Sequence, residues 1–108
     1  MEMEIKFLLG NAFSLNMLAE KNASITVSEL SVARASELAA KARSVVGHPD
    51  TAAVFTTELG VEVPANRESV VLNNGDVLIV GQYTGPRLPE GATELPEGAE
   101  ITWLLVRV

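Results

Sequence analysis

The sequence contains no cysteine and only one histidine, His48. The absence of cysteine excludes a disulfide framework, a thiolate metal site and a thiol nucleophile, and it fits a reducing compartment. One histidine without cysteine disfavours a catalytic zinc site within one chain. The carboxylates are scattered and lack the paired aspartates of two-metal nucleases. We therefore expect no metal and no cofactor, and a phosphodiesterase built on this chain would be metal-independent.

Several common catalytic and nucleotide-binding motifs are also absent. The chain has no Walker loop, no G-x-G-x-x-G turn, no G-x-S-x-G elbow and no H-E-x-x-H helix. The sequence therefore gives no support to a P-loop NTPase, a dinucleotide-binding enzyme, a serine hydrolase or a zinc protease.

Basic residues are scarce. Eight Lys and Arg stand against 14 Asp and Glu, which gives a formal net charge of −6. A protein that follows long DNA or RNA needs a basic face with many phosphate contacts, and this balance does not supply one. A short oligonucleotide is still compatible, because a few phosphates need only a few arginines and some backbone N–H groups. The composition favours a compact ligand over a nucleic-acid polymer.

Long apolar runs are missing as well. No stretch approaches the ~20 residues that span a bilayer, and residues 1–4 are acidic where a signal peptide would be basic. We expect a soluble, unprocessed, cytoplasmic protein with no membrane partner. The 108 residues, 47% of them apolar, suffice for one folded domain, which we assign to residues 1–108.

Apolar patterning predicts alternating strands and helices. Strands are expected at residues 3–9, 23–27, 68–72, 77–83 and 101–108. Helices are expected at residues 15–18, 31–46 and 51–59. Ser14, Ser31 and Asp50 are the expected N-caps, and Gly47 and Gly60 the expected helix ends. This order predicts an α/β (α+β) fold of a single domain, with a mixed β-sheet of about five strands and helices packed on it.

Two connections have a distinct composition. Residues 73–76 (N-N-G-D) predict a hairpin turn that joins the strands at 68–72 and 77–83. Residues 84–98 form a loop rich in Pro and Gly, in which the motif L-P-E-G-A begins at residue 88 and again at residue 95. Two copies are too few for a repeat architecture.

His48 lies between the predicted end of one helix and the start of the next. Such a hinge holds a side chain fixed yet reachable, and an imidazole can donate or accept a proton near neutral pH. His48 is therefore the leading catalytic candidate. The alternative, from the residues alone, is a surface or capping histidine without a chemical role.

Charged and polar residues in three further segments are candidates for ligand binding. Arg87 and Glu90 lie in the long loop, where an Arg could clamp a phosphate and a Glu could exchange a proton, or where both could be solvated loop charges. A polar cluster follows the first predicted strand and consists of Asn11, Ser14 and Asn16. Free backbone N–H groups at such a turn can bind an anion, or the three side chains can simply cap and stabilise the turn. Arg67, just before a strand, has the same two interpretations.

These segments together resemble the ring nuclease family, found as viral anti-CRISPR proteins and as cellular enzymes of type III CRISPR systems. Residues 11–18 (N-A-F-S-L-N-M-L) are close to the family's N-A-F-S-I-N-M-L. Gly47-His48 with an Asp/Thr-containing helix start, and Asn66-Arg67 before a strand, also match. Gln82 and residues 87–91 (R-L-P-E-G) resemble the family's Q-R-L-E-E-G. The chain departs from the family in Pro49, where members have Asp, and in residues 83–86, which separate Gln82 from Arg87.

The resemblance implies an activity and a set of roles. The family cleaves cyclic tetra-adenylate to linear di-adenylate without a metal, using the ligand's own 2′-OH, and so switches off type III CRISPR signalling. By this resemblance His48 would donate a proton, Glu90 would assist it, and Arg87 would bind phosphate. The remaining substrate-binding residues would be Asn11, Ser14, Asn16, Arg67 and Gln82. The family acts as a homodimer, which would place one histidine on each half of a symmetric ring.

Two other functions remain alternatives. A non-catalytic module could bind a cyclic oligoadenylate in order to sequester or sense it, and an interaction protein could retain only the fold. Replacing His48 would separate them, because an enzyme needs the imidazole and a pure binder should bind almost as well without it.

Overall fold

The computed structural model describes residues 5–108. Its elements, in chain order, are β1 (Phe7–Gly10), the 3₁₀ turn η1 (Leu15–Met17), β2 (Thr26–Leu30), α1 (Val32–Ala39), β3 (Arg43–Ser44), α2 (Pro49–Leu59), β4 (Val77–Thr84) and β5 (Glu100–Arg107). They form one compact α+β domain, which confirms the predicted fold class. None of the helices within residues 5–108 is long and apolar enough to cross a membrane.

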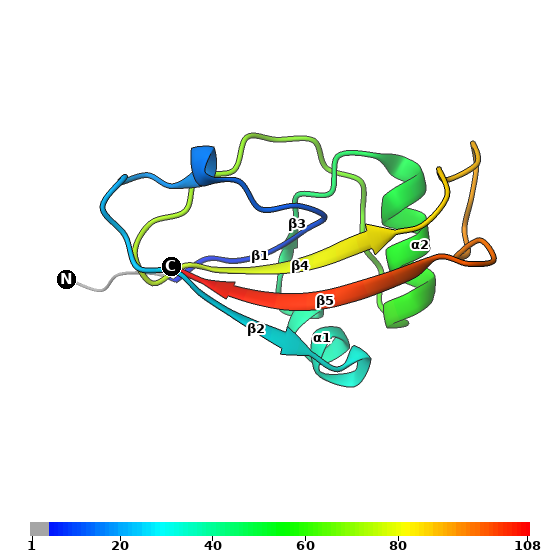
Figure 1. Ribbon diagram of the computed structural model, residues 1–108, viewed down its shortest axis with the longest axis horizontal. Helices are drawn as coiled ribbons and strands as arrows, with labels where there is room; N and C mark the ends of the chain where they lie inside the picture. Colours follow the sequence, from blue (N-terminus) through cyan, green and yellow to red (C-terminus); the bar gives the residue numbers. More distant parts are fainter. Residues whose placement is uncertain (1–4) are drawn as a thin grey trace.

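The five strands form one mixed sheet in the order β2-β5-β4-β1-β3. β1 runs parallel to both of its neighbours, β3 and β4. β4 and β5 are antiparallel over eight residue pairs, from Val77 with Arg107 to Thr84 with Glu100, and β2 runs antiparallel along the outer side of β5. Figure 1 shows β4 and β5 as two long neighbouring arrows that point in opposite directions. The parallel strands β1, β3 and β4 therefore end at the same edge of the sheet.

One face of the sheet packs against the two helices. The side chains in this larger core come from alternate strand residues and from the buried faces of α1 and α2; they include Leu9, Leu38, Val46, Phe55, Ile79 and Trp103. The rings of Phe55 and Trp103 meet edge to face with centroids 4.9 Å apart, a favoured aromatic geometry. Their contact lies over Gly81, where an added Cβ would be only 2.5 Å from the Trp103 ring.

The opposite face of the sheet is covered by loops. A second cluster contains Leu8, Leu78, Val80 and Val106, with Leu72 packed on it from outside the sheet. The segment around η1 pairs with the chain before β4, since Ala19 N–H donates to Leu72 O at 2.9 Å and Leu72 N–H to Met17 O at 2.7 Å. Figure 1 shows these two segments side by side. Because these segments cover only part of the sheet, this face is open towards the edge strand β2, where Val27 is 58% exposed.

The helix predicted at residues 31–46 is half that length. Ser31 is its N-cap, as predicted, but α1 ends at Ala39. The chain leaves the helix through tight turns at Lys41 and Ala42, and β3 then pairs with Leu8 and Leu9. Gly47 consequently ends no helix. A parallel neighbour for β1 and the complete burial of Val46 outweigh the helical preference of the intervening Ala, Lys and Arg residues.

The strand predicted at 68–72 is also wrong. This segment has no strand structure, and only Leu72 forms an isolated bridge, with Leu18. Residues 73–76 make a turn but join no hairpin; β4 pairs instead with β1 and β5. The sheet still has five strands because β3 takes the place of 68–72.

The other boundaries shift by a few residues. β2 lies at 26–30 instead of 23–27. The strand predicted at 3–9 is β1 from Phe7, and residues 3–4 lie outside the described part of the chain. α2 begins at Pro49 with His48 as its N-cap, so the predicted cap Asp50 lies inside the first turn, while Gly60 ends the helix as predicted, with φ 69°.

The turn before β4 is held by a buried carboxylate. Asp76 is 2% exposed. Its oxygens accept the backbone N–H groups of Lys6 at 3.0 Å and Asn73 at 2.8 Å, and the Lys6 ammonium lies 3.3 Å away. Burial raises the pKa of this carboxyl, but the two N–H donors and the Lys6 ammonium together lower it by more than burial raises it. The pKa therefore lies below the ordinary value for aspartate. Asp76 therefore joins the start of β1 to the start of β4 as an anion.

Candidate functional site

The candidate site lies where the parallel strands end. Asn11 directly follows β1, His48 follows β3 after a short connection, and β4 ends at Thr84, before the loop that carries Arg87. Ligands in open sheets of parallel strands bind outside these carboxyl ends, because the connections diverge there and leave a crevice. The topology thus gathers residues that are far apart in the sequence.

His48 is fixed by the first turn of α2. The backbone N–H of Asp50 donates to its Nδ1 atom at 3.2 Å, and Pro49 occupies the first helical position, which needs no N–H donor. Because Nδ1 is an acceptor, a neutral imidazole carries its proton on Nε2. The side chain is 61% exposed, and one oxygen of the Asp50 carboxylate lies 4.0 Å from Nδ1. The ring is held by its inner nitrogen and presents the outer one to solvent.

His48, Arg87 and Glu90 border one cleft of about 750 Å³, together with Pro49 and Asp50. A second cleft of about 610 Å³ is lined by Thr51 and Tyr83 as well as by His48 and Arg87. His48 and Arg87 therefore border both clefts, which lie between the start of α2 and the loop. The sequence analysis included Thr51 in the helix start that matches the family and Tyr83 in the predicted strand 77–83, but it proposed neither as a site residue.

The loop that supplies Arg87 and Glu90 is referred to below as the arm, residues 85–99. Figure 1 shows it beyond the ends of β4 and β5, on the side where α2 lies. Each L-P-E-G-A copy makes the same turn: Ala92 N–H donates to Pro89 O at 3.1 Å, and Ala99 N–H to Pro96 O at 3.0 Å. Gly91 and Gly98 both have the positive φ that such a turn requires, 77° and 83°. The sequence repeat is therefore a repeated turn, and its first copy presents Glu90 to the cleft.

Arg67 lies next to the same hinge. A Cβ added at Gly47 would meet the Nε atom of Arg67 at 3.5 Å, so this side chain covers the backbone just before His48. Its neighbour Asn66 holds this segment against the chain that follows β3. The side-chain amide of Asn66 donates to Ser44 O at 2.9 Å, and its backbone N–H donates to Val46 O at 2.7 Å. A second arginine thus lies against the residue that precedes the histidine.

The remaining predicted binding residues lie elsewhere. Asn11 and Gln82 share a smaller groove of about 300 Å³ on the open face of the sheet, walled by apolar side chains that include Phe13 and Leu104. Ser14 caps η1 by accepting the N–H of Asn16 at 3.3 Å, and both residues are exposed. The predicted set is therefore split between the cleft at His48 and the open face.

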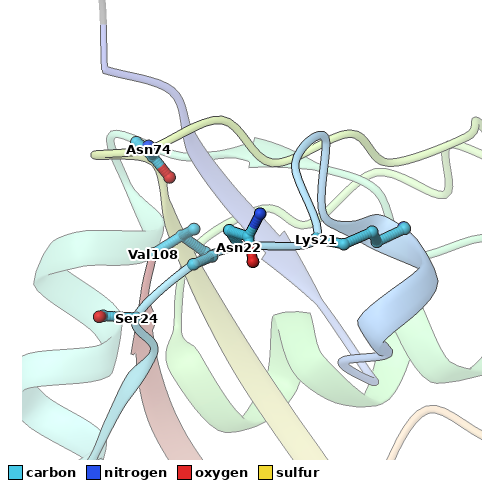
Figure 2. Close-up of a pocket in the computed structure, with 6 residues that line it drawn as sticks. Lys21, Asn22, Ser24, Asn74 and Val108 are labelled. Carbon is cyan, nitrogen blue, oxygen red and sulfur yellow. The ribbon is translucent and has the colours of Figure 1, made fainter.

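A polar cleft of about 620 Å³ occupies the opposite end of the sheet. Figure 2 shows Asn22, Ser24, Asn74 and Val108 around it, with the Lys21 side chain pointing away from the others. The Lys21 ammonium donates to Leu18 O at 3.1 Å. The side chains that line this polar cleft are exposed or half-buried, and none of the candidate residues from the sequence analysis lies there. Across residues 5–108 no three His, Cys, Asp or Glu side chains gather where they could hold a metal ion.

Comparison with known proteins places the chain in a family. A family model described as STIV B116-like matches residues 7–102. The chain belongs to the STIV B116-like family. Its fold is similar to that of B116 of Sulfolobus turreted icosahedral virus, with a TM-score of 0.81 and 29% sequence identity over 95% of this chain and 99% of that one.

A second relative comes from another virus. The chain is 37% identical over 71 residues to "Uncharacterized protein 26" of Sulfolobus islandicus filamentous virus (isolate Iceland/Hveragerdi). This match covers 64% of the chain and spans 60% of the length of that protein. Both relatives are proteins of Sulfolobus viruses. A viral protein is compatible with the resemblance noted in the sequence, because that family includes viral members.

Proposed function

We propose that this STIV B116-like protein is a metal-independent ring nuclease. It would cleave cyclic tetra-adenylate to linear di-adenylate ending in a 2′,3′-cyclic phosphate, and so switch off type III CRISPR signalling. One observation carries the proposal. His48, Arg87 and Glu90, the residues to which the sequence resemblance gives chemical roles, lie around a single cleft of about 750 Å³ although they come from separate segments. A cleft of that size is within the range of small-molecule sites.

The proposed reaction is an internal transfer at phosphorus. The ribose 2′-oxygen forms a bond to the adjacent phosphorus while the bond from phosphorus to the 5′-oxygen of the next nucleotide breaks. The 2′-OH gives its proton to solvent, and the departing 5′-oxygen takes one up from His48, which then regains a proton from solvent. Two such cuts on opposite sides of the ring give two identical linear products. The protein's tasks are to hold the attacking and leaving oxygens in line and to supply the proton.

His48 would supply that proton. Its Nδ1 atom accepts the N–H of Asp50, which orients the ring and leaves Nε2 as the atom that would reach the ligand. In the cationic acid form Nδ1 carries a proton as well, for which the Asp50 carboxylate, 4.0 Å away, would be the partner. The same residue of α2 thus offers a partner to each protonation state of the imidazole.

Arg87 and Glu90 complete the cleft. The guanidinium of Arg87 matches a phosphate with two parallel N–H donors and offsets the charge that grows on the reacting group. Glu90 faces the same space and is positioned to orient the ribose or to assist His48. Arg67, beside Gly47, adds a second cation for a neighbouring phosphate.

A ring of four nucleotides is larger than one cleft, and this accounts for the split in the predicted residues. The groove that holds Asn11 and Gln82 has apolar walls and two amides at its edge, which suits a nucleobase. Ser14 and Asn16 stand exposed beside it. We propose a homodimer, in which a two-fold axis through the ring lets each protomer contribute one His48. A strictly monomeric and fully active protein would overturn this part of the proposal.

A cleavage assay tests the activity. Wild type and His48→Ala are incubated with cyclic tetra-adenylate and EDTA, and ring binding is measured on the same samples. The matched control is Asn22→Ala, in the polar cleft at the far end of β4 (Figure 2). The eight residues of β4, at about 3.3 Å each, separate the two ends of the sheet by about 25 Å. We expect conversion by wild type and Asn22→Ala, and binding without conversion by His48→Ala.

Other outcomes of this assay identify the alternatives. If wild type binds the ring and does not cut it, the protein is a sequestering or sensing module. If wild type does not bind the ring, neither ligand-based function holds and an interaction protein is left.

A further inference from the structure

The two ends of the arm touch. Gly85 has a φ of 144°, a value that side-chain-bearing residues rarely adopt, and a Cβ there would lie 2.7 Å from Cα of Ala99. The backbone of residue 85 therefore passes directly against residue 99. The phenol of Tyr83 also donates to the carbonyl oxygen of Pro86, which fixes the chain locally where it leaves β4. The arm is closed at its base and does not open out as a loose loop.

The middle of the arm is tied to α2. The hydroxyl of Thr57 donates to the carbonyl oxygen of Thr93 at 2.6 Å. The same hydroxyl lies 3.2 Å from the carbonyl oxygen of Ala53, one turn earlier in the helix. A hydroxyl has one proton to donate, and the shorter distance assigns it to the arm. Thr57 is thus the link between the arm and the helix that carries His48 at its other end.

Arg87 and Glu90 lie between these two anchors. The neck at Gly85 fixes one side of the segment, and the Thr57–Thr93 hydrogen bond fixes the other. Within it, the turn closed by Ala92 N–H to Pro89 O sets the direction of Glu90. A short segment held at both ends has few conformations left to lose when a ligand binds, so its side chains meet the ligand already in place.

We infer that Thr57 is a positioning residue, which holds the arm against α2 and so sets Arg87 and Glu90 opposite His48. Its importance for catalysis rests on the proposed function; its hold on the arm does not. The tie is of moderate strength, because a hydroxyl released from Thr93 returns to the Ala53 carbonyl and is not left without a partner. Loss of the tie should loosen the arm without unfolding the protein.

Limited trypsin digestion tests the hold on the arm without any ligand. The arm contains one trypsin site, the Arg87–Leu88 bond. Cleavage of this bond is faster the more often the surrounding segment is released from its place. In Thr57→Val, which keeps the shape and removes the hydroxyl, we expect cleavage after Arg87 to accelerate about fivefold, the effect of one neutral hydrogen bond. In Thr57→Ser, which keeps the hydroxyl, and in the remote exposed Thr26→Val, the rate should stay at the wild-type value.

Cleavage after Lys21, in a loop at the far end of the sheet, serves as the internal reference in every digest. An increase at both bonds in Thr57→Val would mean general destabilisation and would overturn the specific tie. An unchanged rate at Arg87 would overturn it as well.

The ring assay then tests the catalytic consequence. Thr57→Val should lower kcat several-fold and raise KM, and Thr57→Ser should restore both. If wild type cleaves the ring and Thr57→Val loosens the arm yet turns over normally, Thr57 holds the arm but does not position the site, and the inference fails in that part. If wild type does not cleave the ring, the proposed function fails, while the digestion still decides whether Thr57 holds the arm.

Discussion

The Nδ1 atom of His48 accepts the backbone N–H of Asp50 at 3.2 Å. The only histidine of the chain is therefore the N-cap of α2 and, at the same time, borders the cleft that Arg87 and Glu90 also line. The same side chain therefore has a structural role, as a helix cap, and is the candidate for the chemical role, as a proton donor. The two roles can be separated only by a substitution that keeps one role and removes the other.

His48→Asn is such a substitution. Asn is among the best N-cap residues, so it should keep the hydrogen bond to the Asp50 N–H and leave the free energy of unfolding close to that of wild type. His48→Ala removes the cap and should lower the free energy of unfolding by about 0.5–2 kcal/mol. Urea unfolding measures both.

Activity should follow a different order. Neither variant can donate a proton from an imidazole, so both should lose ring cleavage by a factor of roughly 10²–10⁴. Activity retained in His48→Asn would show that the cap alone matters and that His48 takes no part in the chemical step.

Glu90 has an internal control in Glu97. Both residues occupy the same position in the two L-P-E-G-A turns, but only Glu90 borders the cleft. We expect Glu90→Gln to reduce ring cleavage by roughly one to two orders of magnitude, as for loss of an assisting carboxylate. Glu97→Gln should leave cleavage and stability unchanged. Equal losses in the two variants would point to the negative charge of the arm and not to the position of Glu90.

Asp76 should stabilise the fold in a pH-dependent way. Asp76→Asn keeps the shape of the side chain but weakens three interactions of a buried anion, and we expect it to lower the free energy of unfolding by about 1–3 kcal/mol at neutral pH. Thermal or urea unfolding measures the difference.

The direction of the pH effect follows from the lowered pKa of Asp76. In the unfolded chain an aspartate titrates near a pKa of about 3.9. Above that pH the carboxylate is charged in both states, and its full stabilisation is present. As the pH falls through the lower folded-state pKa, the folded protein also takes up the proton and the stabilisation is lost. The difference between wild type and Asp76→Asn should therefore shrink below about pH 4, and a difference constant down to pH 2 would contradict the role of the charge.

Gly81 should tolerate no side chain. A Cβ at this position would lie 2.5 Å from the Trp103 ring and 2.6 Å from that of Phe55, both in the buried core. Gly81→Ala must push the two rings apart, and we expect a loss of about 1–3 kcal/mol in stability. Trp103 is the only tryptophan, so its fluorescence reports both the unfolding midpoint and the displaced ring. Unchanged emission and unchanged stability would mean that the two rings move aside without penalty.

Local patterns predicted the elements whose neighbours are close in the sequence. The caps at Ser14 and Ser31, the end of α2 at Gly60 and the core of the strands at 77–83 and 101–108 all follow from short-range chemistry. Local patterns gave wrong predictions where a residue distant in the sequence determines the secondary structure. Arg43 and Ser44 form a strand only because β1 lies beside them, and residues 68–72 form none because both edges of β4 are already taken.

The candidate site shows the same limit. His48, Arg87 and Glu90 stood out by residue type and by family resemblance, and the structure brings them to one cleft. Sequence reasoning had no signal for Thr57, because a threonine on an exposed helix face has no distinctive pattern. It also grouped Asn11 and Gln82 with His48, whereas the structure places them on the open face of the sheet. The separation into a cleft and a groove depends on which face of the sheet each residue occupies, and no local pattern records that.

The parallel pairing of β1 with β4 bears on how the protein is made. Leu8 lies opposite Leu78, so the centre of the sheet joins residues that are 70 positions apart in the sequence. Contacts this distant in sequence form slowly, because a long stretch of chain must first be closed. During translation β1 has no β4 neighbour until most of the chain has left the ribosome, and the apolar Leu8 and Leu9 wait uncovered. The nascent chain is most exposed to aggregation and proteolysis just before β4 emerges.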